Sequence, residues 1–332
     1  MVRSTLLGVG SHVPERVVTN DDLARLMTTS DEWIYQRSGI RERRFIERSG
    51  VGASDLGLPA SRAAIADAGL RPEDIDAIVF ATLSPDYFFP GSGCLLGDKL
   101  GLNGKPAIDI RNQCTGFLYA LSVADGWIRT GLYRHVLVVG AEVHSTGLEF
   151  NDRGRDVAVL FGDGAGAVVM GPTADERRGL QSLCLHADGS GVKDLWCEGP
   201  ASAYDPRVDE AMLAAGRHYP KMVGKHVFRW AIEKMPEVAI EAVERAGITL
   251  ADVDLFIPHQ ANMRINQLVA ARLELPDEKV VHNIEQFGNT TAATIPMALD
   301  RARREGRVKP DATLLFAAFG AGYTWGGAVL RL

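Results

Sequence analysis

The sequence predicts an α/β protein, and three of its features point to that class. Apolar runs rich in β-branched residues alternate with stretches of helical spacing, which is typical of strands joined by helices. The runs are apolar on both faces, as expected of central strands that are covered on both sides. A segment of the second half also repeats one of the first. With 332 residues, these features favour a duplicated α/β architecture with a sizeable core.

Each expected element follows from a local pattern. The expected strands are the apolar runs at residues 76–82, 135–141, 166–171, 253–259 and 312–320. The expected helices have amphipathic spacing and end near a glycine, and they are residues 53–69, 228–247 and 290–306.

The repeat has two matches at one offset. "AGLRPEDIDAIVF" at residues 68–80 matches "AGITLADVDLFIP" at residues 246–258, an offset of 178 residues. The same offset aligns "CTGFLYAL" at residues 114–121 with "AATIPMAL" at residues 292–299. Chance similarity of two helix-to-strand turns is the alternative for one match alone. Two matches indicate an ancestral duplication.

Each half also ends in a Gly-rich turn that leads into an apolar strand, "FGDGAGAVVMG" and "FGAGYTWGGAVLRL". We therefore expect an N-terminal half at residues 1–175 and a C-terminal half at residues 176–332. Residues 187–220 are rich in Gly, Ser, Asp and Pro without clear periodicity, and we expect them to form an extended loop.

Composition argues against several classes of partner. The formal net charge is -6 and the charges form no long blocks, so neither nucleic acid nor an anionic membrane is an expected partner. No apolar run reaches the roughly 20 residues of a membrane helix, and a cytoplasmic location is expected. The four cysteines form no CxxC pair, which favours free thiols over a disulfide framework or a metal site.

Cys114 lies where a short apolar run meets a long helical pattern. A cysteine at the start of a helix feels the positive end of the helix dipole, so we expect its pKa to fall below about 8.5. The alternative is a small buried thiol that packs a helix start. We assign that alternative to Cys94, Cys184 and Cys197.

Two residues of the second half are candidates to share a site with Cys114. His259 follows the expected strand at residues 253–259, where sites of α/β sheets gather. Asn289 lies in a turn before the next helix, close to the duplicate of Cys114. The alternatives are a histidine that bonds a local backbone group and an asparagine that caps a turn.

Several motifs together resemble 3-oxoacyl-[acyl-carrier-protein] synthase III, namely "NQCTGF", "PHQANMRI", "FGNTTAATIP" and "FGAGYTWGGAVLRL". The resemblance runs essentially end to end. It implies a thiolase fold in a five-layered α/β/α/β/α arrangement and a Cys114–His259–Asn289 triad. Cys114 would accept an acyl group from an acyl-CoA, and malonyl-acyl carrier protein would be the second substrate. No cofactor is implied beyond the coenzyme A thioester itself.

The resemblance also implies how the triad works. The His259 Nε2 proton and the Asn289 amide would be two neutral donors to the malonyl carbonyl. The backbone N–H groups of Cys114 and Ala321 would form an oxyanion hole for the acyl carbonyl.

Further roles carry over to residues outside the triad. Trp33 and Arg153 would sandwich the adenine of coenzyme A, with Arg37 near the phosphates. Phe89 would lie at a homodimer interface and close the partner's acyl pocket. Arg217, Lys221, Lys225 and Arg229 form a basic row with period four. Lys225 and Arg229 of this row, and Arg264 outside it, would dock the acidic carrier protein. A solvated helix face is the alternative for this row, and Pro220 interrupts it.

Departures from the family pattern leave the acyl primer open. Gln113 and Thr115 are larger or more polar than is usual beside the nucleophile, Lys225 replaces an asparagine, and "SPDYFFPGSG" is unusual at the acyl pocket. An acyltransferase that moves the Cys114 acyl group to an alcohol or amine is an alternative function. A non-catalytic partner of a carrier protein is another. A degradative thiolase is disfavoured because "FGAGYTWGG" has no second cysteine.

Overall fold

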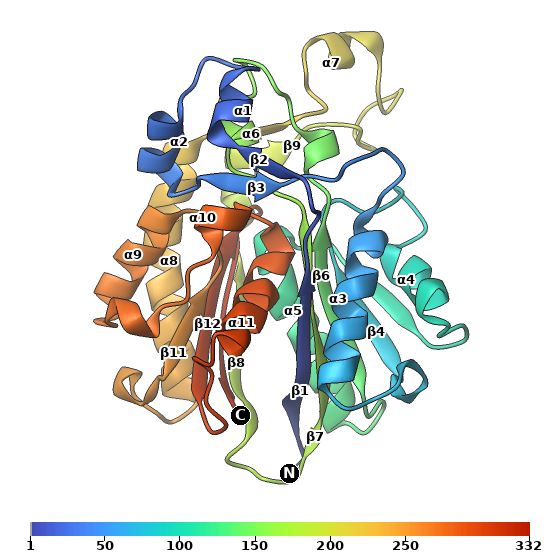
Figure 1. The fold of residues 1–332 in the computed structure, drawn as a ribbon, viewed down its shortest axis with the longest axis vertical. Coiled ribbons are helices and arrows are strands. Elements are labelled where there is room, and N and C mark those ends of the chain that lie inside the picture. Colours follow the sequence, from blue (N-terminus) through green and yellow to red (C-terminus); the bar gives the residue numbers. More distant parts are fainter. Residues whose placement is uncertain (1) are drawn as a thin grey trace.

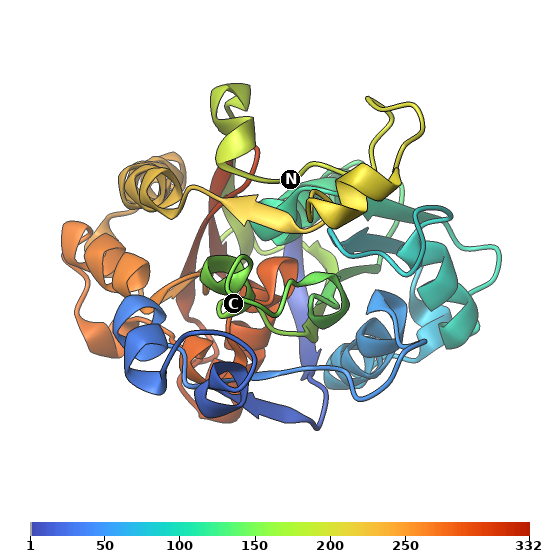
Figure 2. The same cartoon turned by 90° about the horizontal axis from the view of Figure 1, so that it is seen from above.

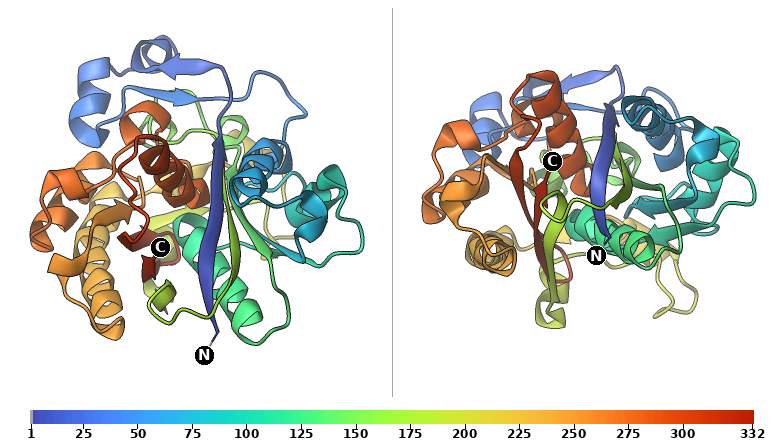
Figure 3. Two further views of the ribbon diagram at one scale, coloured as in Figure 1. Left: turned by 60° about the horizontal axis from the view of Figure 1, so that its bottom comes forward. Right: turned by 90° about the horizontal axis from the view of Figure 1, so that it is seen from below.

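The computed structural model describes residues 2–332, whose helices and strands form five layers (Figure 1). The layers in order are α3 (Ala53–Asp67) with α4 (Ser92–Leu100), a five-stranded sheet, α5 (Gly116–Arg129) with α11 (Thr294–Arg304), a four-stranded sheet, and α8 (Gly224–Arg245) with α9 (Met263–Arg272). This α/β/α/β/α arrangement confirms the predicted fold class. Seen from below, α11 lies between the two sheets (Figure 3).

The first sheet has the strand order β1-β7-β6-β4-β5. β4 pairs in parallel with β5 and β6, whereas β7 is antiparallel to β6 and β1. Every residue of β4 and β6 is buried, because helices cover both faces of the sheet. The strands are β1 (Arg3–His12), β4 (Ala77–Ala81), β5 (Ala107–Ile110), β6 (Val136–Glu142) and β7 (Gly164–Thr173).

The second sheet has the strand order β11-β12-β13-β8. β11 is parallel to β12, and β13 is antiparallel to both of its neighbours. Its strands are β8 (Gly179–Ala187), β11 (Leu255–Pro258), β12 (Thr313–Gly320) and β13 (Thr324–Arg331). The five predicted strands and three predicted helices are all present, with shifts of a few residues at their ends.

Elements at the offset of 178 residues correspond in type. The 3-10 turns η2 (Gln113–Thr115) and η7 (Thr291–Ala293) precede α5 and α11, and Gln113 and Thr291 share a φ of 43°. α5 and α11 bury their apolar faces in one core cluster between the sheets. The two turns therefore meet in the middle of the molecule, where η2 packs against η7.

Small elements gather above the sheets, at the end opposite to both termini (Figure 1). They are β2 (Val17–Thr19), α1 (Asn20–Ala24), α2 (Asp31–Ser38), β3 (Glu42–Arg44), α6 (Arg155–Ala158) and α10 (Ile284–Phe287). Further 3-10 turns are η1 (Pro72–Asp74), η3 (Ser145–Gly147), η4 (Gly189–Asp194), η5 (Leu250–Asp252) and η6 (Asp277–Lys279).

The expected extended loop at residues 187–220 is partly wrong. This segment contains β9 (Leu195–Cys197), which pairs with β10 (Pro220–Met222), and the short helix α7 (Glu210–Ala214). It crosses the top of the molecule (Figure 2). Its two strands are too short to show periodicity, and each depends on a partner about 25 positions away, so local pattern could not reveal them.

Within residues 2–332, no helix combines the length and hydropathy needed to cross a bilayer. All four cysteines are free thiols. The same described residues contain no group of three or more His, Cys, Asp or Glu side chains arranged to hold a metal ion.

Candidate active site

Cys114 is buried in η2, at the start of α5. The end of β12 approaches it closely: a Cβ atom added to Gly320 would lie only 2.9 Å from the Cys114 Cβ. A side chain at position 320 would therefore displace Cys114. The backbone N–H groups of Ala321 and of Cys114 itself interact with the sulfur.

The expected low pKa of Cys114 is wrong. Burial raises the pKa of its thiol to about 12, and the nearby Glu142 carboxylate raises it further, against the two backbone N–H groups that lower it. Loss of solvent disfavours the thiolate more than the start of a helix favours it. The resting thiol is therefore protonated, and its reaction requires a base.

His259 directly follows β11 and is buried. Its backbone N–H donates to Ala317 O at 2.8 Å, and its Nδ1 lies 2.7 Å from Thr294 Oγ1. Its Nε2 is buried without a partner. Burial lowers the pKa of His259 to about 3, so the imidazole is neutral at physiological pH.

Thr294 is the hydrogen-bond partner that selects the His259 tautomer. Its hydroxyl lies 2.9 Å from Thr291 O and 2.7 Å from His259 Nδ1, and its single hydrogen can point to either acceptor. With the hydrogen on Thr291 O, Nδ1 carries the ring proton and Nε2 presents a lone pair; with the hydrogen on Nδ1, Nε2 carries the proton that the sequence led us to expect. Thr294 was missed because nothing in the sequence relates a threonine of α11 to a histidine 35 residues earlier.

Asn289 is buried just before η7. Its Oδ1 accepts a hydrogen bond from Thr291 N at 2.8 Å, which orients the amide so that Nδ2 is the free donor. Its backbone N–H donates to Leu160 O at 2.8 Å. Asn289 and His259 are thus both anchored to the η7 region, and Cys114 lies in the turn that packs against it.

A cavity of about 680 Å³ opens beside Cys114. Thr291 and Ala321 also line it, so it lies next to the nucleophile and to η7. Its further walls come from the ends of β4 and β6 and from the segment that carries β9, with side chains that include Leu83, Val143, His144, Leu148, Phe161, Trp196 and His218.

A second cavity, of about 530 Å³, contains Trp33 and Arg37. Two guanidinium groups flank the indole: Arg37 Cζ lies 4.2 Å and Arg155 Cζ 4.7 Å from the ring centroid. Arg153, which the resemblance pairs with Trp33, instead bonds the buried Glu149 carboxylate and Ala214 O. The side chain stacked on Trp33 beside Arg37 is therefore Arg155, because Glu149 holds Arg153 elsewhere.

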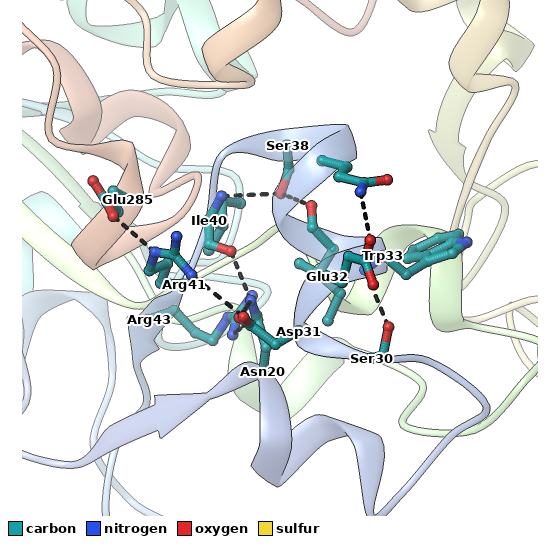
Figure 4. A network of polar contacts seen from close by, with 12 residues as sticks. Asn20, Ser30, Asp31, Glu32, Trp33, Ser38, Ile40, Arg41, Arg43 and Glu285 are labelled. Atoms are coloured by element: carbon teal, nitrogen blue, oxygen red, sulfur yellow. Dashed lines mark hydrogen bonds and ion pairs between the residues drawn. The ribbon is translucent and has the colours of Figure 1, made fainter.

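A polar network fixes the helix that presents Trp33 (Figure 4). Ser30 caps α2 by accepting from Trp33 N at 3.1 Å. Asn20 Nδ2 donates to Asp31 Oδ1 at 2.8 Å and to Ile40 O at 2.7 Å, at the two ends of α2. Arg41 forms ion pairs with Asp31 of the helix and with Glu285 of α10, and so joins the two elements. The indole therefore projects from a well-anchored helix.

The basic row is only partly helical. Lys225 and Arg229 lie exposed on α8, and Arg264 lies exposed on α9 with its guanidinium over the Phe228 ring. Within residues 2–332 none of these three cations has an acidic partner. The expected continuation to Arg217 and Lys221 is wrong, because α8 begins at Gly224 and both residues pair with Glu198.

Phe89 lies in the loop between β4 and α4 and is 79% exposed. Its neighbours Tyr87 and Phe88 are also exposed. Phe89 is not among the residues that line the cavity at Cys114 of its own chain.

Five layers, with a buried cysteine at the start of one central helix and a histidine and an asparagine held by the start of the other, define a thiolase-fold condensing enzyme. The family described as 3-oxoacyl-[acyl-carrier-protein] synthase III matches residues 108–189, and its C-terminal part matches residues 243–332. The beta-ketoacyl-[acyl-carrier-protein] synthase III of Bordetella petrii is 44% identical over 100% of this chain and 99% of its own length. The chain belongs to this family of acyl-transferring condensing enzymes.

Other relatives agree. The synthase III of Caldanaerobacter subterraneus is 42% identical over 99% of this chain and 98% of its own length. The crystal structure of the Aquifex aeolicus synthase III has a TM-score of 0.90 at 40% identity and covers 99% of this chain and 100% of that one. The priming β-ketosynthase of the R1128 polyketide pathway has a TM-score of 0.92 at 37% identity, covering 99% and 96%.

Proposed function

We propose that Cys114 takes an acyl group from an acyl-CoA and that the enzyme condenses it with malonyl-acyl carrier protein, releasing CO2 and forming a 3-oxoacyl-acyl carrier protein. This is the first condensation of fatty-acid synthesis or of a related pathway. The observation that carries the proposal is the grouping of His259 and Asn289 around η7, against the turn that holds Cys114. The steps use side chains and backbone amides of this chain and the two thioesters.

Acylation begins with proton transfer. The lone pair of His259 Nε2 takes the thiol proton of Cys114, and the sulfur attacks the thioester carbonyl. The Ala321 and Cys114 N–H groups bind the oxyanion. The carbonyl then re-forms as the carbon–sulfur bond to coenzyme A breaks, and His259 Nε2 passes the proton to the departing coenzyme A thiolate, which leaves the imidazole neutral.

Condensation uses the other neutral tautomer of His259, in which Thr294 Oγ1 donates to Nδ1 and Nε2 carries the ring hydrogen. Nε2–H and Asn289 Nδ2–H donate to the malonyl thioester carbonyl as the carbon–carbon bond to the carboxylate breaks and CO2 leaves. The enolate carbon attacks the acyl carbonyl on Cys114. The ketone carbonyl of the product then re-forms as the carbon–sulfur bond to Cys114 breaks, and the Cys114 thiolate takes a proton from water, which returns the site to its starting state.

Two charged regions fit the two substrates. Trp33 with Arg37 and Arg155 offers an aromatic face and two cations for the adenine and phosphates of coenzyme A. Among residues 2–332, Lys225, Arg229 and Arg264 are exposed cations without an acidic partner, and Arg264 lines the same cavity as Trp33. We propose that this group of three docks the acidic carrier protein.

We also propose a homodimer of subunits that each contain related halves, residues 1–175 and 176–332. Exposed Tyr87, Phe88 and Phe89 and the edge strand β5, whose Ile108 is 40% exposed, support a self-pairing surface. Phe89 would then close the acyl cavity of the partner. Light scattering of the wild type and of Phe89→Ala tests the assembly.

The chain passes from one sheet to the other between β7 and β8, which supports the division into two halves. The cytoplasmic location stays a prediction.

The function is tested with radiolabelled acetyl-CoA and malonyl-acyl carrier protein. We expect label on Cys114 and CO2 release stoichiometric with the condensed acyl group. Cys114→Ser should lose the label and the acyl-dependent CO2 release, and the matched control Cys94→Ser should retain both. Label without CO2 release would indicate acyl transfer to another acceptor. A protein that binds the carrier but takes up no label would contradict the proposal.

A further inference from the structure

His144 places an imidazole in the wall of the cavity beside Cys114, where the rest of the chemistry does not use it. It lies just past the end of β6, is 7% exposed, and lines the same cavity as Cys114 and Thr291. Its backbone is held firmly, since its N–H donates to the buried Asp163 Oδ1 at 2.7 Å. Its ring packs against Phe161 with centroids 4.8 Å apart. The imidazole is therefore a fixed part of the cavity.

One nitrogen of this ring is occupied and the other is free. Nε2 lies 2.6 Å from Thr291 Oγ1. Within residues 2–332, Nδ1 makes no hydrogen bond. Protein atoms do not enclose it completely, and because His144 lines the cavity, Nδ1 is accessible from there. Burial lowers the pKa of His144 to about 3, which keeps the ring neutral, with one donor and one acceptor nitrogen.

The neighbours of Thr291 indicate which nitrogen is the acceptor. The Thr291 hydroxyl lies beside the Glu142 carboxyl group, which also accepts from Thr82 Oγ1 and Ser84 Oγ. Burial raises the pKa of Glu142 to about 7, and in its ionised form this group is an acceptor only. With its hydrogen directed to Glu142, the Thr291 oxygen accepts from His144 Nε2–H. The lone pair of Nδ1 then faces the cavity.

A second imidazole in the same cavity also has an unsatisfied nitrogen. His218 lines the cavity from the segment between α7 and β10, and its Nδ1 is buried without a partner. That Nδ1 is enclosed by protein atoms, so it is not open to an occupant of the cavity. The cavity therefore combines apolar walls such as Phe161 and Leu148 with a polar atom, His144 Nδ1, that a hydrocarbon chain would leave unpaired.

We propose that His144 is a specificity-determining residue that makes the cavity favour acyl primers carrying a hydrogen-bond donor, a hydroxyl or an N–H, over hydrocarbon chains of the same length. The inference rests on the proposed function, because it takes the acyl group on Cys114 as the occupant of this cavity. A donor on the primer pairs with the Nδ1 lone pair. A plain alkyl chain displaces water from that nitrogen and makes no hydrogen bond in its place.

The test compares 3-hydroxybutyryl-CoA with butyryl-CoA. Acylation of Cys114 is followed by single-turnover release of coenzyme A and by mass spectrometry of the acyl-enzyme. We expect the wild type to favour the hydroxylated primer by roughly tenfold in kcat/KM, which is the scale of one good hydrogen bond. His144→Leu should abolish or reverse that ratio while still accepting butyryl-CoA, and His144→Gln, which keeps an acceptor oxygen, should retain part of it. His186→Leu, a histidine outside the cavity, is the matched control and should keep the wild-type ratio.

The outcomes separate this inference from the proposed function. Acetyl-CoA and malonyl-acyl carrier protein are assayed in parallel, so loss of labelling and of CO2 release with these substrates contradicts the condensing function itself. If those steps proceed and the wild type does not favour the hydroxylated primer, the role of His144 is overturned. It is equally overturned if His144→Leu keeps the ratio within about twofold. If His144→Leu fails to fold, the wild-type ratio and His144→Gln decide the matter.

Discussion

The starts of α5 and α11 have the same backbone and different chemistry. Each is a 3-10 turn that opens with a residue at φ 43°, yet the first turn carries Cys114 where the second carries Ala292. At the second turn, two threonines position the other site residues. The backbone N–H of Thr291 donates to the Asn289 side chain, and the hydroxyl of Thr294, at the start of α11, bonds His259. In the proposed mechanism, one copy of the repeat thus supplies the nucleophile, and the other positions the groups that act on the substrate.

Each turn is also supported by the opposite half. Gly320 of β12 allows close approach to Cys114, and Gly140 of β6 would place a Cβ only 2.3 Å from Ala292 O. Neither turn could hold its position in an isolated half, because a strand of the other half forms part of its surroundings.

The largest effect is expected when Cys114 in the first turn is replaced by alanine, the residue at the equivalent position of the second turn. Cys114→Ala should lower acyl-enzyme formation by more than about 10⁴-fold, because no other side chain of η2 can form the thioester. Slow decarboxylation of malonyl-acyl carrier protein should persist, since His259 and Asn289 remain anchored to η7. Coenzyme A release and CO2 release, measured separately, check this. Loss of both to the same extent would contradict the division of labour.

A smaller loss of activity is expected from a substitution next to the second turn. Asn289→Ala removes one donor to the developing enolate and should lower kcat of condensation by about 10²–10³-fold. Acylation should change by only a few fold, because the oxyanion hole at Ala321 is untouched. Single-turnover rates for the two steps give the comparison, and equal losses in both would show that Asn289 acts on the nucleophile as well.

The pH dependence of Cys114 alkylation compares two opposing effects on the pKa of its thiol, the helix dipole and burial. Since burial raises the pKa of its thiol to about 12, the thiolate fraction is small at neutral pH and grows about tenfold per pH unit. Alkylation of Cys114 by iodoacetamide should therefore accelerate about 100-fold between pH 7 and pH 9 without a plateau. Mass spectrometry must assign the site, because Cys94 and Cys197 are exposed. A plateau below pH 8 would restore the low pKa that the sequence led us to expect.

The smallest effect concerns the hydroxyl that orients His259. Thr294→Val removes the partner of Nδ1 and should lower kcat by about tenfold and the free energy of unfolding by about 1 kcal/mol. Thr294→Ser should restore the rate. Thr290→Val removes a neighbouring hydroxyl that contacts Met297 Sδ, and it serves as the control in the same assay and in thermal unfolding. Full activity of Thr294→Val would show that packing alone orients the imidazole.

Much of the fold and site follows from local pattern. Strands such as β6 and β12 are continuous apolar runs, and the repeat with its offset of 178 residues places η2 and η7 in equivalent positions. The triad residue types were recognisable because each stands in a short, distinctive motif. The stacking partner of Trp33 was not, because Glu149 decides the direction of Arg153 and no spacing rule connects that choice to Trp33.

The sequence by itself indicated the order of elements and the internal repeat, which depend on periodicity, and its motifs indicated Cys114, His259 and Asn289 through their resemblance to a family. Only the tertiary structure decided the protonation of Cys114, the partner of His259 Nδ1 and the presence of His144 in the cavity beside Cys114. The physical reason is that burial and hydrogen-bond direction depend on groups distant in the chain. Desolvation and a single threonine hydrogen set the chemistry here, and neither has a signature in local sequence.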